Sequence, residues 1–409
     1  MVRKIYQSVV ILLVLILGSH AYAQNYIPGE LLVHLRPGTS INQFNQNYGT
    51  WTLASSSFNT SYRLAIPANA NVQAFVTRMS SDNRVLSVSP NLRNADKGKM
   101  PAVPVLQWIS SANGDGNALP ILAQLTQPFT QGVNYGPIAS RYSGEGVTVA
   151  ILDTGISRRN PALAYQVTTG WNFVNNTANT DDVPQGTDSN QNMIPDQAVG
   201  HGTMVAGIVA HFAPHAKLLP VRVLDSDGEG TLWATVEGIH YAISKGARVL
   251  NLSFGSTQRS QLLADAIAEA SANNALVISS AGNDNSSQPN YPADIAQAIN
   301  VAAVNNQGVK AAFSNYGASV DLDAPGVSIV STYWNGGYAI WSGTSFAAPM
   351  VSAEAALVLS AKPDMTALAL RQRLLASSHS IDSRNPKYVG MLGKNGAGMI
   401  DMDLALSGL

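Results

Sequence analysis

The chain has 409 residues, and its 24 Lys and Arg nearly balance its 25 Asp and Glu. The formal net charge of -1 gives no strong field to attract nucleic acid or an anionic membrane, so neither is an expected partner. The length predicts a main domain and a smaller one, while the absence of cysteine excludes disulfides, thiolate catalysis and cysteine metal sites.

The N-terminus has the three parts of a secretory signal peptide. Arg3 and Lys4 precede the apolar run VVILLVLILG at 9–18, and small residues at 21 and 23 form an A-x-A cleavage site. The run is short for a membrane span, and we expect no later stretch to cross a bilayer. We therefore predict a signal peptide over 1–23 and a secreted or extracytoplasmic protein. An uncleaved anchor is the alternative.

Residues 24–97 have the pattern of a small α+β domain. Apolar residues alternate as in strands at 29–35, 51–57, 62–66 and 84–89, and helical patterns occupy 39–47 and 70–82. This β-α-β-β-α-β order is the split βαβ, or ferredoxin-like, arrangement. So small a unit is marginal alone and is expected to need a partner surface.

Residues 98–143 contain many prolines and little periodicity, so we predict an irregular segment that leads into the main domain over 98–409. From 147 onward, short apolar runs alternate with amphipathic helical patterns. The runs are VTVAIL (147–152), LLPVRVL (218–224), VLNLS (249–253), ALVIS (275–279) and INVAAV (299–304). This alternation predicts an α/β fold with a mostly parallel sheet and helices on both faces. Sites in such folds form beyond the carboxyl ends of the strands.

Three side chains stand where this sheet would direct them at one crevice. Asp153 ends the first run in AILDTG, His201 begins a helix in GHGTMVAG, and Ser345 begins another in SGTSFAAP. Each has an ordinary structural explanation, because Asp-x-Gly makes turns and Ser and Thr cap helices. Together they supply what nucleophilic acyl transfer needs: a hydroxyl, an imidazole that takes its proton, and a carboxylate that orients the imidazole.

Two further motifs fit the same reaction. In SSAGND, the Asn283 amide could donate to a developing oxyanion beside the backbone N–H of Ser345. In LSFG, the edge formed by Ser253, Phe254 and Gly255 could pair with an extended peptide. Gly-Asn is also a routine turn signal, and LSFG could be an unpaired strand end.

These motifs resemble those of the subtilisin-like serine proteases, the subtilases, and the order Asp, His, Ser is the subtilisin order. The resemblance covers about 141–409, and residues 25–90 resemble the inhibitory propeptide that chaperones such enzymes. It implies a secreted endopeptidase, made as a self-processing zymogen, that cuts protein or peptide substrates through an acyl-enzyme and is inhibited by its own propeptide.

The resemblance also implies a role for each matching residue. Ser345 would attack, His201 would carry the proton, Asp153 would orient His201, and Asn283 would stabilise the oxyanion. Ser253, Phe254 and Gly255 would bind the substrate main chain. Asp284 could line the first specificity pocket, although an exposed turn explains it as well. The chain departs from the commonest pattern at Met204, Phe346 and Ala348, which bears on substrate preference more than on chemistry.

Calcium is common in this family, and one acidic, Asn-rich loop offers the oxygen ligands that calcium prefers. The candidate ligands are Asp181, Asp182, Asp188, Asn190 and Asp196. They form no complete ligand loop of fixed spacing, and a solvated surface loop explains them equally. The chemistry itself requires no cofactor.

Two other classes fit part of the pattern. An α/β-hydrolase esterase would use the same three groups, but 343–347 lacks the second glycine of a nucleophile elbow, and both Asp153 and His201 precede the serine. A non-catalytic exported binding module, or a zymogen that cuts only itself, would keep the fold. The presence of all four residues argues against a dead scaffold.

Overall fold

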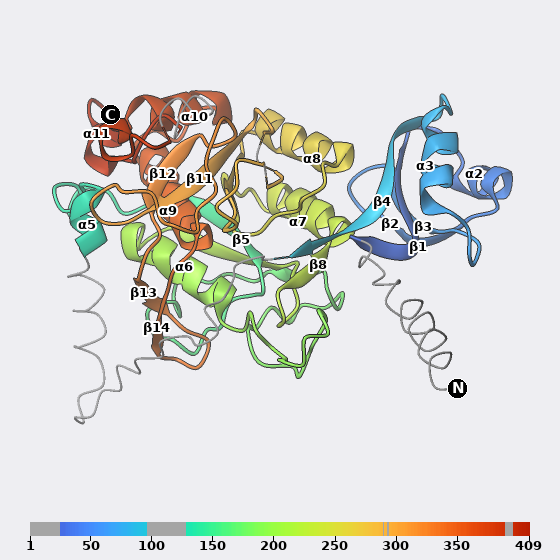
Figure 1. Ribbon diagram of the computed structural model, residues 1–409, viewed down its shortest axis with the longest axis horizontal. Coiled ribbons are helices and arrows are strands. Elements are labelled where there is room, and N and C mark those ends of the chain that lie inside the picture. The colour runs from blue at the N-terminus through green and yellow to red at the C-terminus, as the bar shows by residue number, and fades with distance from the viewer. Residues whose placement is uncertain (1–24, 96–127, 289, 293, 389–395) are drawn as a thin grey trace, which may run out of the picture.

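The structure is a computed structural model that describes residues 25–95, 128–288, 290–292, 294–388 and 396–409. The predicted signal peptide and much of the irregular segment lie outside the described residues. Figure 1 shows a small N-terminal unit beside a larger C-terminal unit, with strand β4 running from the first into the second.

The N-terminal unit is an antiparallel sheet in the order β2-β3-β1-β4, with two helices packed on it. Its elements are β1 (Tyr26–Leu35), α2 (Ile41–Tyr48), β2 (Trp51–Ser55), β3 (Ser61–Ala65), α3 (Val72–Ser80) and β4 (Val85–Ala95). Side chains cap both helices, because Ser40 accepts from Gln43 N–H and Asn71 accepts from Ala74 N–H. The predicted split βαβ arrangement is confirmed.

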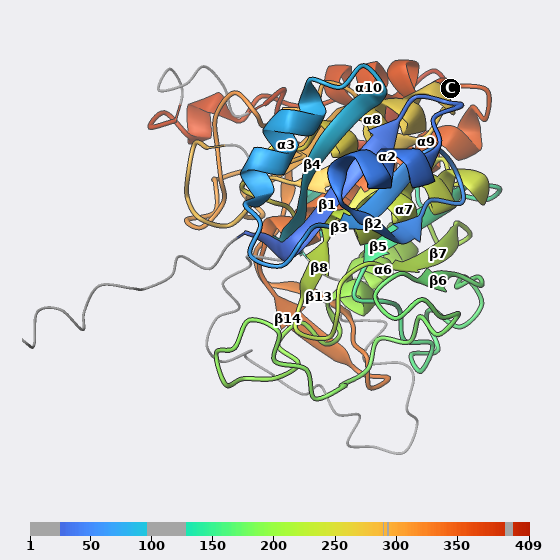
Figure 2. The same cartoon turned by 90° about the vertical axis from the view of Figure 1, so that its right-hand side faces the viewer.

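The two faces of β1 bury their apolar side chains in different places. Leu31 and Val33 pack into the small core of the N-terminal unit with Phe44. Leu32, on the opposite face, packs into a cluster that includes Trp233 of the C-terminal unit. Because neighbouring residues of a strand point to opposite faces, this one sheet lies between its own helices and the other unit (Figure 2).

The C-terminal unit is built on a seven-stranded parallel sheet in the order β12-β11-β10-β9-β5-β7-β6. These strands are β5 (Thr148–Asp153), β6 (Trp171–Asn172), β7 (Lys217–Arg222), β9 (Val249–Leu252), β10 (Leu276–Ser280), β11 (Ala298–Val304) and β12 (Leu322–Pro325). The predicted α/β fold with a mostly parallel sheet is confirmed.

Helices cover both faces of this sheet, as predicted. The helices of the unit are α5 (Pro128–Gly132), α6 (His201–Phe212), α7 (Leu232–Ser244), α8 (Gln261–Ala272), α9 (Thr344–Ala361), α10 (Ala367–Ala376), η1 (Asp382–Arg384) and α11 (Met402–Leu406). Strand β5 shows the division: Ile151 packs in the cluster that contains residues of α6 and α9, and Leu152 packs with residues of α7 and α8.

Helix α9 runs through the core and carries Ser345 in its first turn. By length and composition this helix could cross a membrane, although we expected no such stretch after the signal peptide. In the structure, 89% of its apolar window is buried in the fold. Glu354 lies in this helix with none of its side chain exposed, and neither carboxyl oxygen has a hydrogen-bond partner in the part of the chain described. Burial, and secondarily the charge of Asp401, hold the pKa of Glu354 well above its usual range.

The two units are joined by a strand pair that the sequence did not predict. Strand β8 (Glu229–Thr231) extends the N-terminal sheet by pairing antiparallel with β4, with Asn94 opposite Gly230. Beside this pair, the Asn91 side chain accepts from the N–H of Trp233, at 3.2 Å. The N-terminal unit is thus bonded through its backbone to the larger unit.

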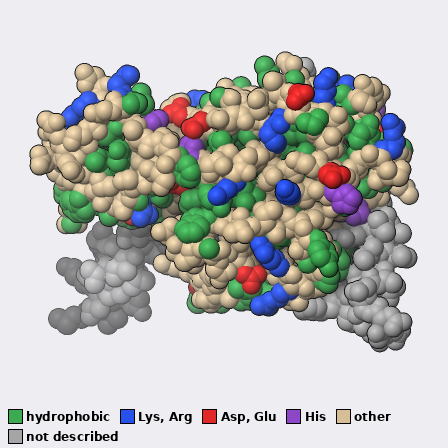
Figure 3. All heavy atoms as spheres, turned by 180° about the vertical axis from the view of Figure 1, so that it is seen from behind, with side chains coloured by type: hydrophobic (Ala, Val, Ile, Leu, Met, Phe, Trp, Pro, Cys, Tyr) green, Lys and Arg blue, Asp and Glu red, His purple; other side chains and the backbone are tan. Residues whose placement is uncertain are grey.

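Histidine and acidic side chains also gather where the two units meet (Figure 3). His240 Nε2 lies 3.3 Å from Glu269 Oε2, and its Nδ1 lies 3.8 Å from Glu237 Oε1. His34 of β1 faces this group and is half-buried. Burial lowers the pKa of His34, as does nearby His240, whereas Asp265 and Glu269 oppose this change.

Candidate active site

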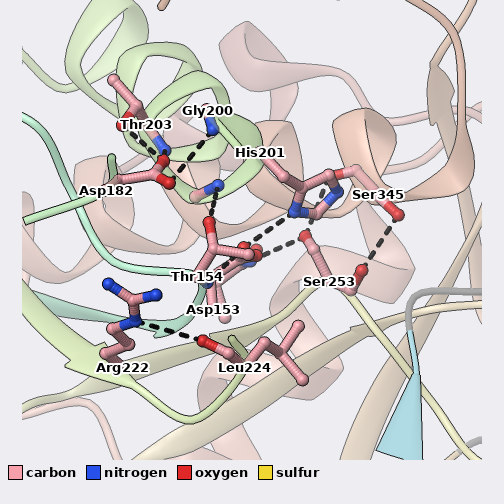
Figure 4. Close-up of polar contacts among 12 residues, drawn as sticks. Asp153, Thr154, Asp182, Gly200, His201, Thr203, Arg222, Leu224, Ser253 and Ser345 are labelled. Carbon is pink, nitrogen blue, oxygen red and sulfur yellow. Dashed lines mark hydrogen bonds and ion pairs between the residues drawn. The ribbon is translucent and has the colours of Figure 1, made fainter. Parts of the chain in front are cut away.

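The structure brings Asp153 and His201 into direct contact. The Asp153 carboxylate, at the carboxyl end of β5, lies 2.8 Å from His201 Nδ1, and both side chains are almost fully buried, at 0% and 1% exposed (Figure 4). Because a carboxylate only accepts, Nδ1 carries the ring proton and Nε2 carries the lone pair. Gly202 allows this approach, since a Cβ there would lie 2.2 Å from the carbonyl oxygen of Gly155.

Helix α6, which begins at His201, is held by a carboxylate from far upstream. The Asp182 side chain accepts from Gly200 N–H (3.0 Å), Thr203 N–H (3.1 Å) and the Thr203 hydroxyl (2.7 Å). It therefore caps the helix, whose own N-cap is a glycine without a side-chain bond. Burial raises the pKa of Asp182, although these hydrogen bonds oppose the change. Asp182 was expected as a metal ligand, but its contacts make it a support for His201.

Ser345 is held against Ser253 by two reciprocal hydrogen bonds. The Ser345 hydroxyl donates to the Ser253 carbonyl at 2.9 Å, and the Ser253 hydroxyl donates to the Ser345 carbonyl at 2.8 Å. Asn251 Nδ2 donates to Ser253 Oγ at 2.8 Å, which fixes that hydroxyl in turn. Figure 4 shows Ser345 beside the ring of His201, so the three groups predicted to act together meet at one place.

Asn283 follows β10 and lies against the first turn of α9. Its side-chain oxygen accepts from the Thr344 N–H (2.9 Å) and hydroxyl (3.0 Å). Because the side-chain oxygen accepts these two bonds, the other end of the amide, Nδ2, is the donor. This nitrogen lies near Gly343, since a Cβ added to Gly343 would be 3.7 Å from Asn283 Nδ2. The helix N-terminus and this amide thus place donors around Ser345.

Aromatic rings form one wall of the site, and sequence reasoning missed most of them. The His201 ring centroid lies 5.4 Å from that of Phe346 and 6.2 Å from that of Trp341. Trp341 comes from the hairpin of β13 (Ile329–Thr332) and β14 (Tyr338–Trp341). Tyr333 from the same hairpin packs where Gly200 lacks a side chain. Of these rings, only Phe346 is singled out by the sequence.

In the segment expected to bind substrate, Ser253 to Gly255, the fold engages the side chains of the first two residues, and binding of a substrate by its main chain stays a prediction. Ser253 is bonded to Ser345, and Phe254 packs in the core with 3% of its surface exposed. Directly after it, Ser256 exchanges backbone hydrogen bonds with Tyr291. The strand that does hold an extended segment is β8, which the sequence did not single out. Asp284 is exposed, and its N–H donates to Asn315 Oδ1, so its role in a specificity pocket stays a prediction.

The loop proposed for calcium brings two of its candidate side chains together, because Asp188 and Asn190 both accept from the Asn192 N–H. Among the described residues, no group of three or more His, Cys, Asp or Glu could hold a metal ion. Asp188 accepts from two backbone N–H groups of its own loop, and Asp196 accepts from three. The Asn190 side chain donates to Gln197, and the Asp181 carbonyl accepts from buried Arg222. The contacts of these residues tie the loop together and give calcium no support.

Comparison with known proteins agrees with this architecture. A model of the subtilase family matches residues 144–398, and a model of the fervidolysin N-terminal prodomain matches residues 19–91. Thermitase from Thermoactinomyces vulgaris is 42% identical over 227 residues, which cover 53% of this chain and 76% of that protein. Subtilisin BL from Lederbergia lenta is 36% identical over 264 residues, covering 62% of this chain and 91% of that protein.

Solved structures show the same likeness. A protease from Pseudoalteromonas arctica superposes with a TM-score of 0.60 at 29% identity, covering 67% of this chain and 93% of its own. A cold-adapted subtilisin-like serine proteinase gives 0.56 at 28% identity, covering 64% and 90%. Fold and matches together define a serine protease, hence a hydrolase, with an N-terminal prodomain. The chain belongs to the subtilase family.

Proposed function

We propose that the protein is a secreted serine endopeptidase that is made as a self-processing zymogen. The observation that carries this proposal is the buried pair of Asp153 and His201 beside Ser345. A carboxylate that fixes the proton on Nδ1 leaves Nε2 able to accept the serine proton, which is the requirement for a serine nucleophile near neutral pH.

In the reaction we propose, the Ser345 hydroxyl turns from the Ser253 carbonyl to His201 Nε2 and loses its proton there as Oγ attacks the substrate carbonyl carbon. The oxyanion that forms accepts from Asn283 Nδ2 and the Ser345 N–H. His201 then gives the proton to the leaving amine as the C–N bond breaks, which leaves an acyl-enzyme. A water molecule, deprotonated by His201, hydrolyses the ester and restores Ser345. In this proposal, groups of the chain and one water molecule carry these steps.

The prodomain, which we extend to residue 97, is the inhibitor in this proposal. Its strand β4 holds the edge of β8 at Glu229 to Thr231. Gly230 of β8 is also bridged to Leu224, whose N–H donates to the Asp153 carbonyl at 3.2 Å. A segment on β8 therefore lies close to the strand end that carries Asp153. Removal of the prodomain would free this edge for an extended substrate.

The decisive test is Ser345→Ala in the full chain. We expect the variant to retain its prodomain and to lose casein hydrolysis, whereas the wild-type chain should lose residues 24–97 and hydrolyse casein. Intact mass and N-terminal sequencing of the secreted protein, with and without a serine-directed fluorophosphonate, measure processing and labelling together. Casein hydrolysis that persists in purified Ser345→Ala would place the nucleophile elsewhere.

Two further measurements address the base and the inhibitor. Activity should fall on acidification as His201 takes up a proton, and a flat profile down to about pH 4 would contradict its role as base. An added fragment of residues 24–97 should inhibit the mature enzyme. No inhibition at micromolar concentration would overturn the inhibitory role.

A further inference from the structure

One buried side chain from a later part of the chain holds the loop that carries Asn283. Asn315 lies between β11 and β12, and 4% of its surface is exposed. Its Oδ1 accepts from the N–H groups of Asp284 and Ser286, at 3.0 Å each. Its Nδ2 donates to the Ala281 carbonyl at 2.8 Å. A single amide is therefore bonded to the backbone on both sides of Asn283.

Backbone hydrogen bonds join the same two segments. The Asn315 N–H donates to the Gly282 carbonyl at 2.9 Å, and the Asn285 N–H donates to the Phe313 carbonyl at 2.7 Å. Gly282 and Asn285 have φ angles of +100° and +50°, so the loop follows no regular helix or strand. A Cβ at Gly282 would lie 2.5 Å from Asn315 Nδ2, so this close contact requires glycine. Bonds from outside the loop thus fix its path.

We propose that Asn315 is a positioning residue of the reaction, which holds this loop so that Asn283 Nδ2 meets the developing oxyanion. The inference rests on the proposed function, since it takes the Asn283 amide as the oxyanion donor. Asn315 acts through the backbone of the loop and gives no hydrogen bond to the substrate.

The physical basis is that the Asn283 side chain has two anchors. At one end its Oδ1 accepts from the N–H and the hydroxyl of Thr344. At the other end is the loop backbone, which Asn315 fixes, and the two anchors together determine where Nδ2 lies. A donor stabilises an oxyanion only within hydrogen-bond distance of the place where the charge develops. A displacement of about 1 Å can lower a rate by about 100-fold.

The test compares Asn315→Ala with a matched control, Asn172→Ala. Asn172 lies in β6, the strand at the far edge of the parallel sheet, and is 2% exposed. Its side chain makes the same set of bonds, because Oδ1 accepts from the N–H groups of Val174 and Asn175, and Nδ2 donates to the Asn179 carbonyl. Each variant loses three bonds to the backbone, but only one of them loosens the loop of Asn283.

Each enzyme is produced as the full chain, allowed to process itself, and titrated with a fluorophosphonate so that rates refer to active sites. Asn315→Ala should lower kcat by about 10- to 100-fold and leave KM nearly unchanged, because the oxyanion exists only in the transition state and intermediate. Asn172→Ala should lose stability on thermal unfolding but keep its kcat. If Asn315→Ala does not fold, Asn315→Ser, which keeps a small polar group, takes its place.

A double-mutant cycle with Asn283→Ala separates positioning from a general loss of structure. If Asn315 acts through the Asn283 amide, Asn315→Ala should lower kcat no further in an enzyme that already lacks that amide. A role elsewhere in the site would multiply the two losses.

The inference fails on any of three results. These are an unchanged kcat in the folded Asn315 variant, an equal loss of kcat in Asn172→Ala, and losses that multiply in the cycle. Each would reduce Asn315 to a structural residue while the proposed function stands. Full kcat in Asn283→Ala would instead contradict the oxyanion role assigned to Asn283 in the proposed function, and this inference with it.

Discussion

The sheet of the prodomain and the sheet of the catalytic domain bury their two faces differently. In the catalytic domain, Ile151 and Leu152 of β5 point to opposite faces, and helices of the same domain cover both. In the prodomain, Leu31 packs on its own helices, but Leu32 packs against α7 and α8 of the catalytic domain. The catalytic domain thus covers both faces of its sheet with its own helices. The prodomain covers one face of its sheet with its own helices, and the catalytic domain covers the other.

This difference separates the two tasks of the chain. In the proposed zymogen, we expect the catalytic domain to keep its fold after the prodomain is removed, because helices of the same domain cover both faces of its sheet. A removed prodomain would lose the cover over Leu32 and Leu92, and so small a unit is marginally stable alone. Release should therefore be followed by unfolding of the prodomain.

The largest expected effect lies in the catalytic domain alone. Asn283→Ala should lower kcat by about 100- to 1,000-fold, which is the scale of the equivalent change in a subtilisin. Asn283→Asp keeps an acceptor for Thr344 but removes the donor, so it should lose activity too. Steady-state kinetics on casein-derived peptides measure both. If Asn283→Asp kept full activity, the amide would serve only to hold Thr344.

Substitution of neighbouring leucines tests the comparison directly in the uncleaved Ser345→Ala chain. Leu31→Ala and Leu32→Ala each remove a fully buried side chain and should cost about 2–5 kcal/mol, but in different places. Hydrogen exchange should show lost protection in α2 and α3 for Leu31→Ala, and in β4 and β8 for Leu32→Ala. The same pattern in both variants would mean that the prodomain does not distinguish its two faces.

A smaller effect is expected from Asp182, which supports only the catalytic domain. Asp182→Ala removes the cap of α6 and should cost about 1–2 kcal/mol of stability, with reduced kcat because His201 begins that helix. Asp182→Asn, which keeps an acceptor, should recover part of both losses. Thermal unfolding and kcat of the mature enzyme measure them. Full kcat in a destabilised Asp182→Ala would limit Asp182 to a structural role.

The smallest expected effect is a dependence of docking on pH. Burial keeps the pKa of His34 below its ordinary value of 6.5 while the domains are joined. As the pH falls through 6.5, His34 of a separated prodomain takes up a proton before His34 of a docked prodomain does. Acidification therefore favours separation and weakens docking. Hydrogen exchange at β8 in the Ser345→Ala chain should show less protection at acidic pH. His34→Gln should reduce that dependence, and stronger docking on acidification would contradict it.

The sequence predicted the framework well because the framework depends on local patterns. Buried strands, helix periodicity and the positions of Asp153, His201 and Ser345 at strand ends and helix starts all follow from short-range rules. The carboxyl ends of parallel strands share one edge of a sheet, so convergence of these side chains could be expected from the sequence.

The features that the sequence did not predict depend on contacts between residues far apart in the chain, and no short sequence pattern indicates such contacts. Strand β8 has three residues, one of them Gly230, and its strand partner β4 belongs to the other unit. Asp182 caps a helix from a position 18 residues before Gly200, too far for a capping motif to reveal. The ring of Trp341 meets His201 through the packing of a hairpin. These features surround the reacting groups, and none of them is visible in a short sequence pattern.

The buried Glu354 has a consequence for the conditions that the enzyme tolerates. Its carboxyl resists ionisation in the folded chain, but in an unfolded chain it would ionise near its ordinary value of 4.5. As the pH rises above that value, ionisation stabilises the unfolded chain relative to the folded one until the raised pKa is reached. The helix that presents the nucleophile therefore makes the folded protease less stable as the pH rises through this interval, and Glu354→Gln should reduce that loss.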